Sequence, residues 1–211
     1  MIVEDTGTSF KPVPAGMHLA RCYRIIDIGT QKTEFEGNVK YLHKIKIVWE
    51  VHGNDDEGNP MVTDKNEPMI VNKDYTLSWA EKANLRLDLQ SWRGKAFTDE
   101  EQRRFDLKSV LDKWCMVNVT HKPKKKGNGV YANVTAITPV PSALKLNGMP
   151  KGHNPCKMFQ ISDPDMELFD TFSDYLKKQI EESPEWKART NPVKASSPQS
   201  GFDDMPDDIP F

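Results

Sequence analysis

Cysteine is scarce in this sequence, with three residues, Cys22, Cys115 and Cys156, among 211. An odd number at wide spacing argues against a disulfide framework and fits a reducing compartment. Cys22 and Cys115 lie in apolar runs, so we expect them to be small buried side chains. His153 and Cys156 are spaced like two metal ligands, but no second pair lies at a workable distance. We therefore predict no zinc site.

Long hydrophobic runs are also lacking, and none approaches the length of a membrane span. The first residues, MIVEDTGTSFKPVPAG, have neither the basic start nor the apolar stretch of a signal peptide. We expect a protein that stays in the cytoplasm and does not enter a membrane.

Catalytic motifs are missing as well. The sequence contains no GxSxG, GxxxxGK[ST], HExxH or CxxC pattern. The acidic loop around Asp55, Asp56 and Glu57 resembles a nuclease metal site only in composition, since such a site needs ligands from several rigid elements. We predict a solvated loop, no cofactor and no enzymatic activity, and keep a nuclease or RNA-processing factor as the weakest hypothesis.

Charge is segregated along the chain. The net charge is −2, but Asp203, Asp204, Asp207 and Asp208 place −4 in the last eleven residues, so the remainder carries +2. Because screening acts over about 8 to 10 Å, a remote acidic tail barely weakens the field of a basic groove. The total therefore does not argue against a nucleic-acid partner.

Between residues 15 and 141 we predict five strands and a helix. Apolar and polar residues alternate in the runs 17–29, 40–53 and 69–79, and again in 114–121 and 130–140. In the first run Ala20, Cys22, Ile26 and Ile28 share one face, and Arg24 interrupts it, which a bulge or a twist would accommodate. The basic loop 122–129 makes the last two strands a hairpin.

Helical spacing appears between the third and fourth strand runs. Leu85, Leu89 and Trp92 recur at helical steps before a stop at Gly94, and a second helical piece begins with the acidic residues at 99–101. Three strands, a helix and a hairpin are the order of the OB-fold, a five-stranded Greek-key barrel that binds oligonucleotides. An SH3-like barrel or a β-sandwich remains an alternative. The fold class we predict is all-β dominated with minor α.

Beyond residue 141 the pattern changes. Residues 142–189 read as an irregular connection followed by one helix over 164–183, which Pro184 ends; its apolar face carries Met166, Phe169, Phe172, Leu176 and Ile180. Residues 190–211 are rich in Pro and Ser, and we expect a disordered linker and acidic tail. Residues 1–14 form an N-terminal extension.

Lysines and aromatic residues interleave on the predicted outer surface of the barrel. Lysines in the loop 122–126 repel one another unless an anion meets them, and a phosphate backbone is the usual partner. Aromatic rings stack bases without regard to sequence, which suits single-stranded nucleic acid. The binding residues that we predict are Arg21, Tyr23, Phe35, Tyr41, Lys44, Lys46, Lys122, Lys124, Lys125, Lys126 and Tyr131. A one-residue bulge would turn Tyr23 and Tyr131 into core residues.

The final residues, GFDDMPDDIPF, resemble the acidic tip of bacterial single-stranded DNA-binding proteins. In that family the tip docks onto replication, recombination and repair proteins. The resemblance implies a partner-binding segment made of Asp203, Asp204, Asp207, Asp208, Ile209, Pro210 and Phe211. An acidic tail can also compete for its own basic groove, so we expect deletion of residues 201–211 to strengthen DNA binding.

The body of the chain looks more like the divergent single-stranded DNA-binding proteins of bacteriophages. That resemblance implies a phage protein that protects single-stranded DNA and recruits host machinery in DNA replication, recombination or repair. A protein–protein adaptor whose barrel binds another protein is the alternative, and a homo-oligomer stays open.

Overall fold

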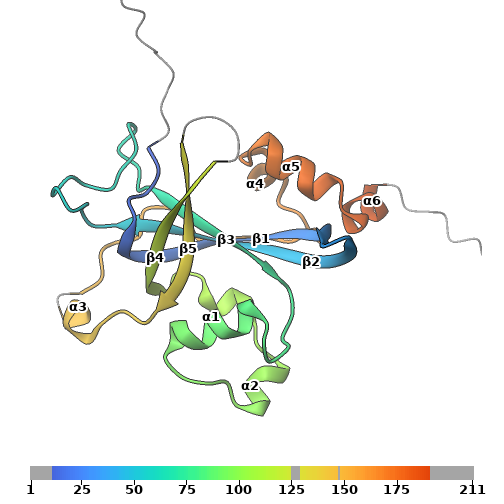
Figure 1. Ribbon diagram of the computed structural model, residues 1–211, viewed down its shortest axis with the longest axis horizontal. Coiled ribbons are helices and arrows are strands. Elements are labelled where there is room, and N and C mark those ends of the chain that lie inside the picture. The colour runs from blue at the N-terminus through green and yellow to red at the C-terminus, as the bar shows by residue number, and fades with distance from the viewer. Residues whose placement is uncertain (1–10, 125–128, 147, 191–211) are drawn as a thin grey trace, which may run out of the picture.

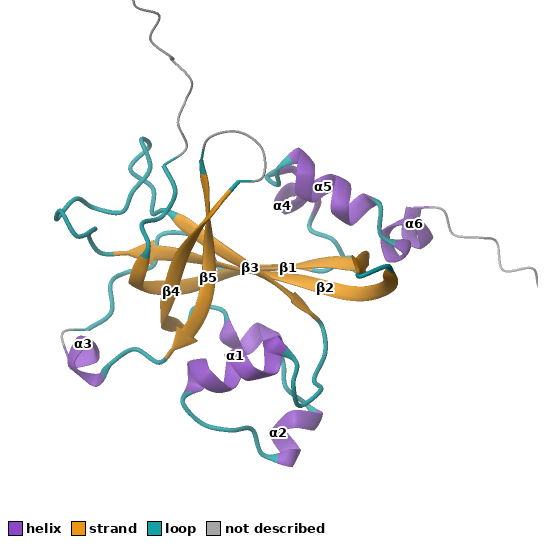
Figure 2. Ribbon diagram, in the orientation of Figure 1, coloured by secondary structure: helices purple, strands orange, loops and turns teal. Residues whose placement is uncertain are grey.

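The computed structural model describes residues 11–124, 129–146 and 148–190. A twisted sheet forms the centre, with helices on two of its sides (Figures 1 and 2). In chain order the elements are β1 (Gly16–Phe35), β2 (Asn38–His52), β3 (Ile70–Thr76), α1 (Asn84–Arg93), α2 (Asp99–Arg103), a 3-10 helix (Leu107–Val110), β4 (Trp114–Pro123), β5 (Val130–Thr138), α3 (Ser142–Leu146), β6 (Lys157–Phe159), α4 (Met166–Asp170), α5 (Asp174–Glu181) and α6 (Pro184–Thr190). The predicted β-dominated chain with minor helices is confirmed.

The sheet follows the order β3-β2-β1-β4-β5, with antiparallel ladders between these neighbours. The short strand β6, which the sequence did not predict, pairs with β1 in parallel. β3 and β5 approach each other, and α1 contacts both. Within the described residues no hydrogen-bonded ladder joins β3 to β5, so the sheet curls without closing.

Two cores share β1 and β2, because bulges in β1 interrupt its alternation of faces. The register shifts between Cys22 and Arg24 and again between Asp27 and Gly29. Each shift adds one residue to β1, so side chains beyond it point to the opposite face. The prediction that Ile26 and Ile28 lie on the face of Cys22 is therefore wrong. The irregularity expected at Arg24 falls one residue earlier, at Tyr23.

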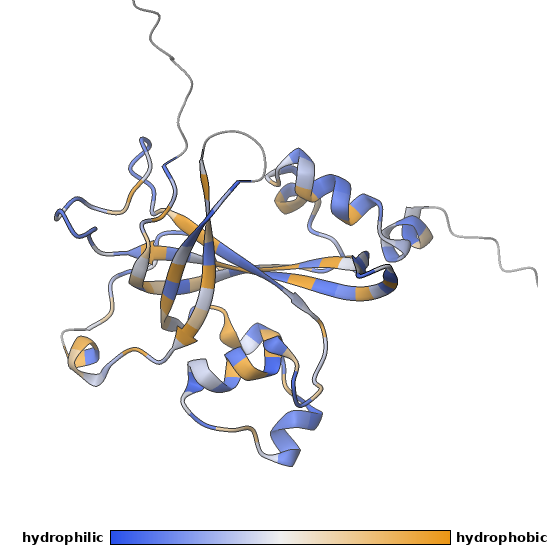
Figure 3. Ribbon diagram, viewed as in Figure 1, coloured by the Kyte–Doolittle hydropathy of each residue, from blue (hydrophilic) through white to orange (hydrophobic). Residues whose placement is uncertain are grey.

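The first core lies inside the curled sheet, between the sheet and α1. It contains Ala20, Cys22, Ile25, Ile47, Trp49, Val71, Tyr75, Leu85, Leu89, Trp92, Cys115, Val117 and Val134, among others. Figure 3 shows the alternation of apolar and polar residues along these strands. The predicted helix is confirmed as α1, and it ends at Gly94 in the left-handed conformation (φ 72°), a backbone that glycine adopts without strain. The predicted hairpin is confirmed as β4 and β5.

The second core lies on the outer face of β1 and β2, beneath α4, α5 and α6. It consists of Tyr23, Ile26, Ile28, Val48, Phe159, Ile161, Leu168, Phe169, Phe172, Leu176, Ile180 and Trp186. The C-terminal helices thus pack on the sheet of their own chain. Within the described ranges, no helix is long and apolar enough to cross a membrane.

The prediction of one continuous helix over 164–183 is wrong. Two helices form instead, because the side chain of Asp165 caps the start of α4 and that of Ser173 caps the start of α5. Pro184 begins α6 rather than only ending the preceding helix, since proline is well tolerated in the first turn of a helix.

Candidate nucleic-acid interface

The exposed end of the β4–β5 hairpin gathers two lysines around one tyrosine. Lys122 lies directly across the ladder from Tyr131, and the Nζ atom of Lys124 lies 5.5 Å from the centroid of the Tyr131 ring. Tyr131 points outward because its neighbour Ala132 packs toward the first core, and the ring is 57% exposed. We call Lys122, Lys124 and Tyr131 the hairpin cluster. An exposed ring with one ammonium group near it and a second lysine across the ladder suits a base and its adjoining phosphates.

The remaining loop lysines that we predicted, Lys125 and Lys126, lie outside the described residues. The loop is closed next to them by a hydrogen bond of 3.0 Å from the backbone N–H of Lys124 to the carbonyl of Gly129. The hairpin cluster therefore stands at the base of the predicted basic loop.

The two predicted lysines of β2 lie on another part of the sheet, beside β3. The Nζ atom of Lys46 donates to the carboxylate of Asp74 and, at 3.3 Å, to Oδ1 of Asn72. Lys44 lines an open pocket of about 470 Å³ together with Thr76 and Lys82. Lys44 is half-buried, and the charge of Lys46 is partly neutralised, so these residues make a weaker anion surface than the hairpin cluster.

Tyr41 lies on the β1–β2 hairpin, across the ladder from Lys32, and is 68% exposed. It is therefore accessible, and its predicted role in DNA binding stays a prediction. Phe35 ends β1, and its side chain lies outside the described part of the structure.

Tyr23 does not lie on the surface as predicted, since it is only 4% exposed. The bulge at this residue turns its ring into the second core, where the guanidinium of Arg24 lies 5.2 Å from the ring centroid of Tyr23 and 5.8 Å from that of Phe172. Burial is the main cause that raises the pKa of Tyr23. In this fold Tyr23 is a packing residue and is not accessible to stack on a base.

Arg21 is also buried, contrary to its predicted place on an outer cationic surface. Its Nε atom donates to Oε1 of Glu50 at 2.8 Å, and its Nη1 atom donates to Oδ1 of Asp112 at 2.7 Å. A guanidinium held between two carboxylates has no free charge for a phosphate. Arg21 therefore stabilises the fold instead of forming part of an exposed anion site.

Glu50, for which we predicted no role, is the centre of this buried cluster. Besides Arg21, it accepts hydrogen bonds from His52 Nε2 (2.9 Å), from the backbone N–H groups of His153 (2.9 Å) and Asn154 (2.8 Å), and from Asn154 Nδ2 (2.7 Å). Burial alone would raise its pKa, but these donors lower the pKa of Glu50 to about 2. The only signal in the sequence was a carboxylate within the apolar run IVWEV.

The residues whose spacing or composition resembled a metal site have structural roles in the fold. His153 supplies its backbone N–H to Glu50, and Cys156 Sγ lies 3.3 Å from Nη1 of Arg21. In the acidic loop, Asp55 accepts hydrogen bonds from the N–H groups of Glu57 and Asn59, which shape a turn. Among the described residues, no three or more His, Cys, Asp or Glu side chains are grouped to hold a metal ion.

The predicted partner-binding segment, Asp203, Asp204, Asp207, Asp208, Ile209, Pro210 and Phe211, lies wholly outside the described residues. Comparison with protein-family models finds no match, and no curated protein is significantly similar to the chain. The function must therefore be argued from the hairpin cluster and its surroundings.

Proposed function

We propose that this chain binds single-stranded DNA with little sequence preference, through the hairpin cluster. The observation that carries the proposal is the exposed Tyr131, which lies across the ladder from Lys122 and has the Nζ atom of Lys124 at 5.5 Å from its ring centroid. Exposed aromatic rings are costly to leave in water, and a ring flanked by cations matches the alternation of bases and phosphates along a strand. Stacking of one base on such a ring contributes about 1 to 3 kcal/mol whatever the base.

The arrangement of the sheet supports the proposal. An OB-fold is a partly open five-stranded barrel that binds oligonucleotides on its second and third strands and on the loops after its first and fourth strands. The sheet order β3-β2-β1-β4-β5, with α1 against the gap between β3 and β5, fits a divergent member of this class. The hairpin cluster then belongs to the loop after the fourth strand, and Tyr41 to the loop after the first.

The helices over the second core restrict where single-stranded DNA can lie on the sheet. Helices α5 and α6 pack against β1, and Val48 is the residue of β2 that belongs to this core. The surfaces that remain are the hairpin cluster, the β2–β3 strip with Lys44 and Lys46, and Tyr41. We propose that these three surfaces together bind single-stranded DNA.

The wider role follows from the resemblance of the tail. We propose a binding protein without enzymatic activity that protects single-stranded DNA in phage DNA replication, recombination or repair. Residues 203–211 would recruit partner proteins, through apolar side chains in a pocket and aspartates at its basic rim. The cytoplasm of the host is the compartment in which we expect it to act.

The test is a fluorescence titration with labelled oligo(dT) and with duplex DNA of equal length, at several salt concentrations. We expect preference for the single strand, and Tyr131→Ala should weaken binding about 5- to 150-fold, corresponding to ~1 to 3 kcal/mol. The double variant Lys122→Gln, Lys124→Gln should lower the salt slope by about 1.4, since each phosphate contact to a single strand adds ~0.7.

Tyr175 provides a matched control. It is an exposed tyrosine (73%) on α5, outside the proposed surface, so Tyr175→Ala should leave oligo(dT) binding unchanged. Equal losses in the two tyrosine variants would refute the hairpin cluster as the site. If neither DNA form binds, the adaptor hypothesis, with a protein as ligand of the barrel, replaces DNA binding.

A further inference from the structure

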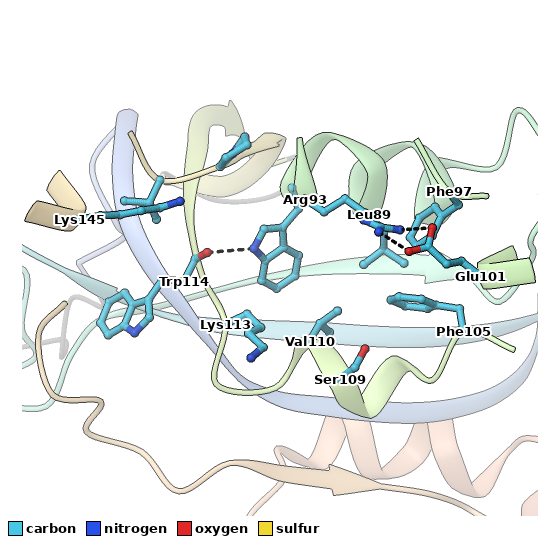
Figure 4. Close-up of a pocket in the computed structure, with 13 residues that line it drawn as sticks. Leu89, Arg93, Phe97, Glu101, Phe105, Ser109, Val110, Lys113, Trp114 and Lys145 are labelled. Atoms are coloured by element: carbon cyan, nitrogen blue, oxygen red, sulfur yellow. Dashed lines mark hydrogen bonds and ion pairs between the residues drawn. The ribbon is translucent and has the colours of Figure 1, made fainter. Parts of the chain in front are cut away.

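A second surface feature lies away from the hairpin cluster, at the side of the sheet covered by α1. It is an open pocket of about 460 Å³ between α1, the connection from α1 to β4, and the residues after β5 (Figure 4). Its walls are largely apolar and aromatic, with Trp92, Phe97, Phe105 and Trp114 among them. An open pocket with aromatic walls favours an apolar group as its occupant.

The charges at this pocket are mainly positive. Arg93 donates to both carboxylate oxygens of Glu101, at 3.1 and 2.6 Å, so this pair neutralises itself. Lys113 and Lys145 also line the pocket, and both are exposed. In Figure 4 these lysines lie toward Trp114, whereas the Arg93–Glu101 pair lies toward Phe97. The occupant should therefore combine an apolar or aromatic group with carboxylates.

Residues 201–211 of this chain have that chemistry. The segment GFDDMPDDIPF contains two phenylalanines, an isoleucine, a methionine and four aspartates, with no lysine or arginine. It also has sufficient reach. Phe202 lies twelve positions beyond Thr190, a stretch that spans at most about 40 Å, while Phe211 can lie up to about 70 Å from Thr190. A domain of this size is roughly 40 Å across.

We propose that residues 201–211 dock into this pocket of their own chain, with a phenylalanine ring between the aromatic walls and aspartates beside Lys113 and Lys145. Attachment through a short linker gives the segment a millimolar effective concentration, so a weak contact is sufficient to hold it. The docked segment is withheld from partner proteins until a tighter site captures it. Only this regulatory consequence rests on the proposed partner-binding role of the tail.

The test uses the indole N–H signals of the five tryptophans in a ¹H–¹⁵N correlation spectrum of the full chain. Deletion of residues 201–211 leaves every described element in place, and it should shift the signals of Trp92 and Trp114 while those of Trp49 and Trp186 stay unchanged. The double variant Lys113→Glu, Lys145→Glu in the full chain should move both signals toward their positions in the deletion variant. A synthetic peptide of residues 201–211, added to the deletion variant, should restore them and bind the charge-reversed pocket roughly tenfold more weakly.

The matched control is Lys122→Glu, Lys124→Glu, which reverses two lysines of the hairpin cluster and should not release the segment. Release by this control alone would place the segment in the DNA-binding groove and overturn the proposal. Identical spectra of the full chain and the deletion variant would also overturn it. A shift that depends on protein concentration would show docking into a second copy instead. Oligo(dT) titration of the same variants separates the two proposals, since loss of DNA binding does not alter the indole readout.

Discussion

Replacement of Glu50 tests whether the buried cluster around Arg21 holds the C-terminal segment on the sheet. The side chains of Arg21 and Glu50 are 6% and 0% exposed, and Glu50 accepts five hydrogen bonds, two of them from backbone N–H groups of residues 153 and 154. Removal of one partner of a buried ion pair typically costs about 3 to 5 kcal/mol. Arg21 keeps Asp112 in a Glu50→Gln variant, so we expect a loss near 3 kcal/mol.

The lowered pKa of Glu50 gives a second estimate of the free energy by which Glu50 stabilises the folded state. The pKa of Glu50 is lowered from 4.5 to about 2, so ionised Glu50 stabilises the folded state by ~3 kcal/mol, at about 1.4 kcal/mol for each pH unit. Because the folded-state pKa is the lower one, this stabilisation is complete above about pH 4.5 and is lost as the pH falls toward 2. The Glu50→Gln variant should lack this part of the acid dependence.

The assay is urea unfolding followed by circular dichroism, at pH 7 and at intervals down to pH 3. In thermal unfolding of the same variant, a loss of ~3 kcal/mol should lower the Tm by about 6 to 12 °C in a protein of this length. The matched control is Lys178→Gln, which removes an exposed pair with Glu182 (3.8 Å) and should change stability by less than about 0.5 kcal/mol. A loss below about 1 kcal/mol for Glu50→Gln, or an unchanged acid profile, would refute this account of the cluster.

Three further substitutions test other parts of the fold. Gly152→Ala should destabilise the protein by about 1 to 3 kcal/mol in urea unfolding, because the added methyl group would overlap the guanidinium of Arg21. Phe159→Ala should cost about 3 to 5 kcal/mol, since this fully buried ring contacts three aromatic rings of the second core; a loss under 1 kcal/mol would contradict that core. Glu185 accepts hydrogen bonds from the backbone N–H (2.9 Å) and the hydroxyl of Thr30, so Glu185→Gln should accelerate hydrogen exchange in α6 while exchange in α1 stays unchanged.

Local signals in the sequence predicted much of the sheet and the first core. Alternation identified the strands, and helical spacing before Gly94 identified α1, because both patterns arise from neighbours along the chain. The hairpin cluster was predictable for the same reason. Lys122 and Tyr131 are joined by a short loop, and Tyr131 keeps the outward position that its alternation with Ala132 implies.

The parts that were mispredicted depend on contacts between distant residues. A single extra residue at Tyr23 reverses the faces of β1 beyond it, and no propensity marks which residue is extruded. The three residues of β6 are too few to show a period, and they are held by parallel pairing with residues 24–26. Arg21 resembled a surface cation because its partner Asn154 lies 133 positions away.

The burial of Arg21 and Tyr23 also restricts where a strand of DNA can bind. Both lie on β1, beneath the segment 152–190 that the Glu50 cluster and the second core attach to the sheet. A strand of DNA therefore has no access to the centre of this face while the segment is packed. The proposed binding residues that stay at least partly exposed lie at its margins, on the β4–β5 hairpin, the β1–β2 hairpin and the β2–β3 strip. Loss of the Glu50 hydrogen bonds in Glu50→Gln should lower stability but leave the proposed contacts at the hairpin cluster intact, so stability and affinity for oligo(dT) should respond to different residues.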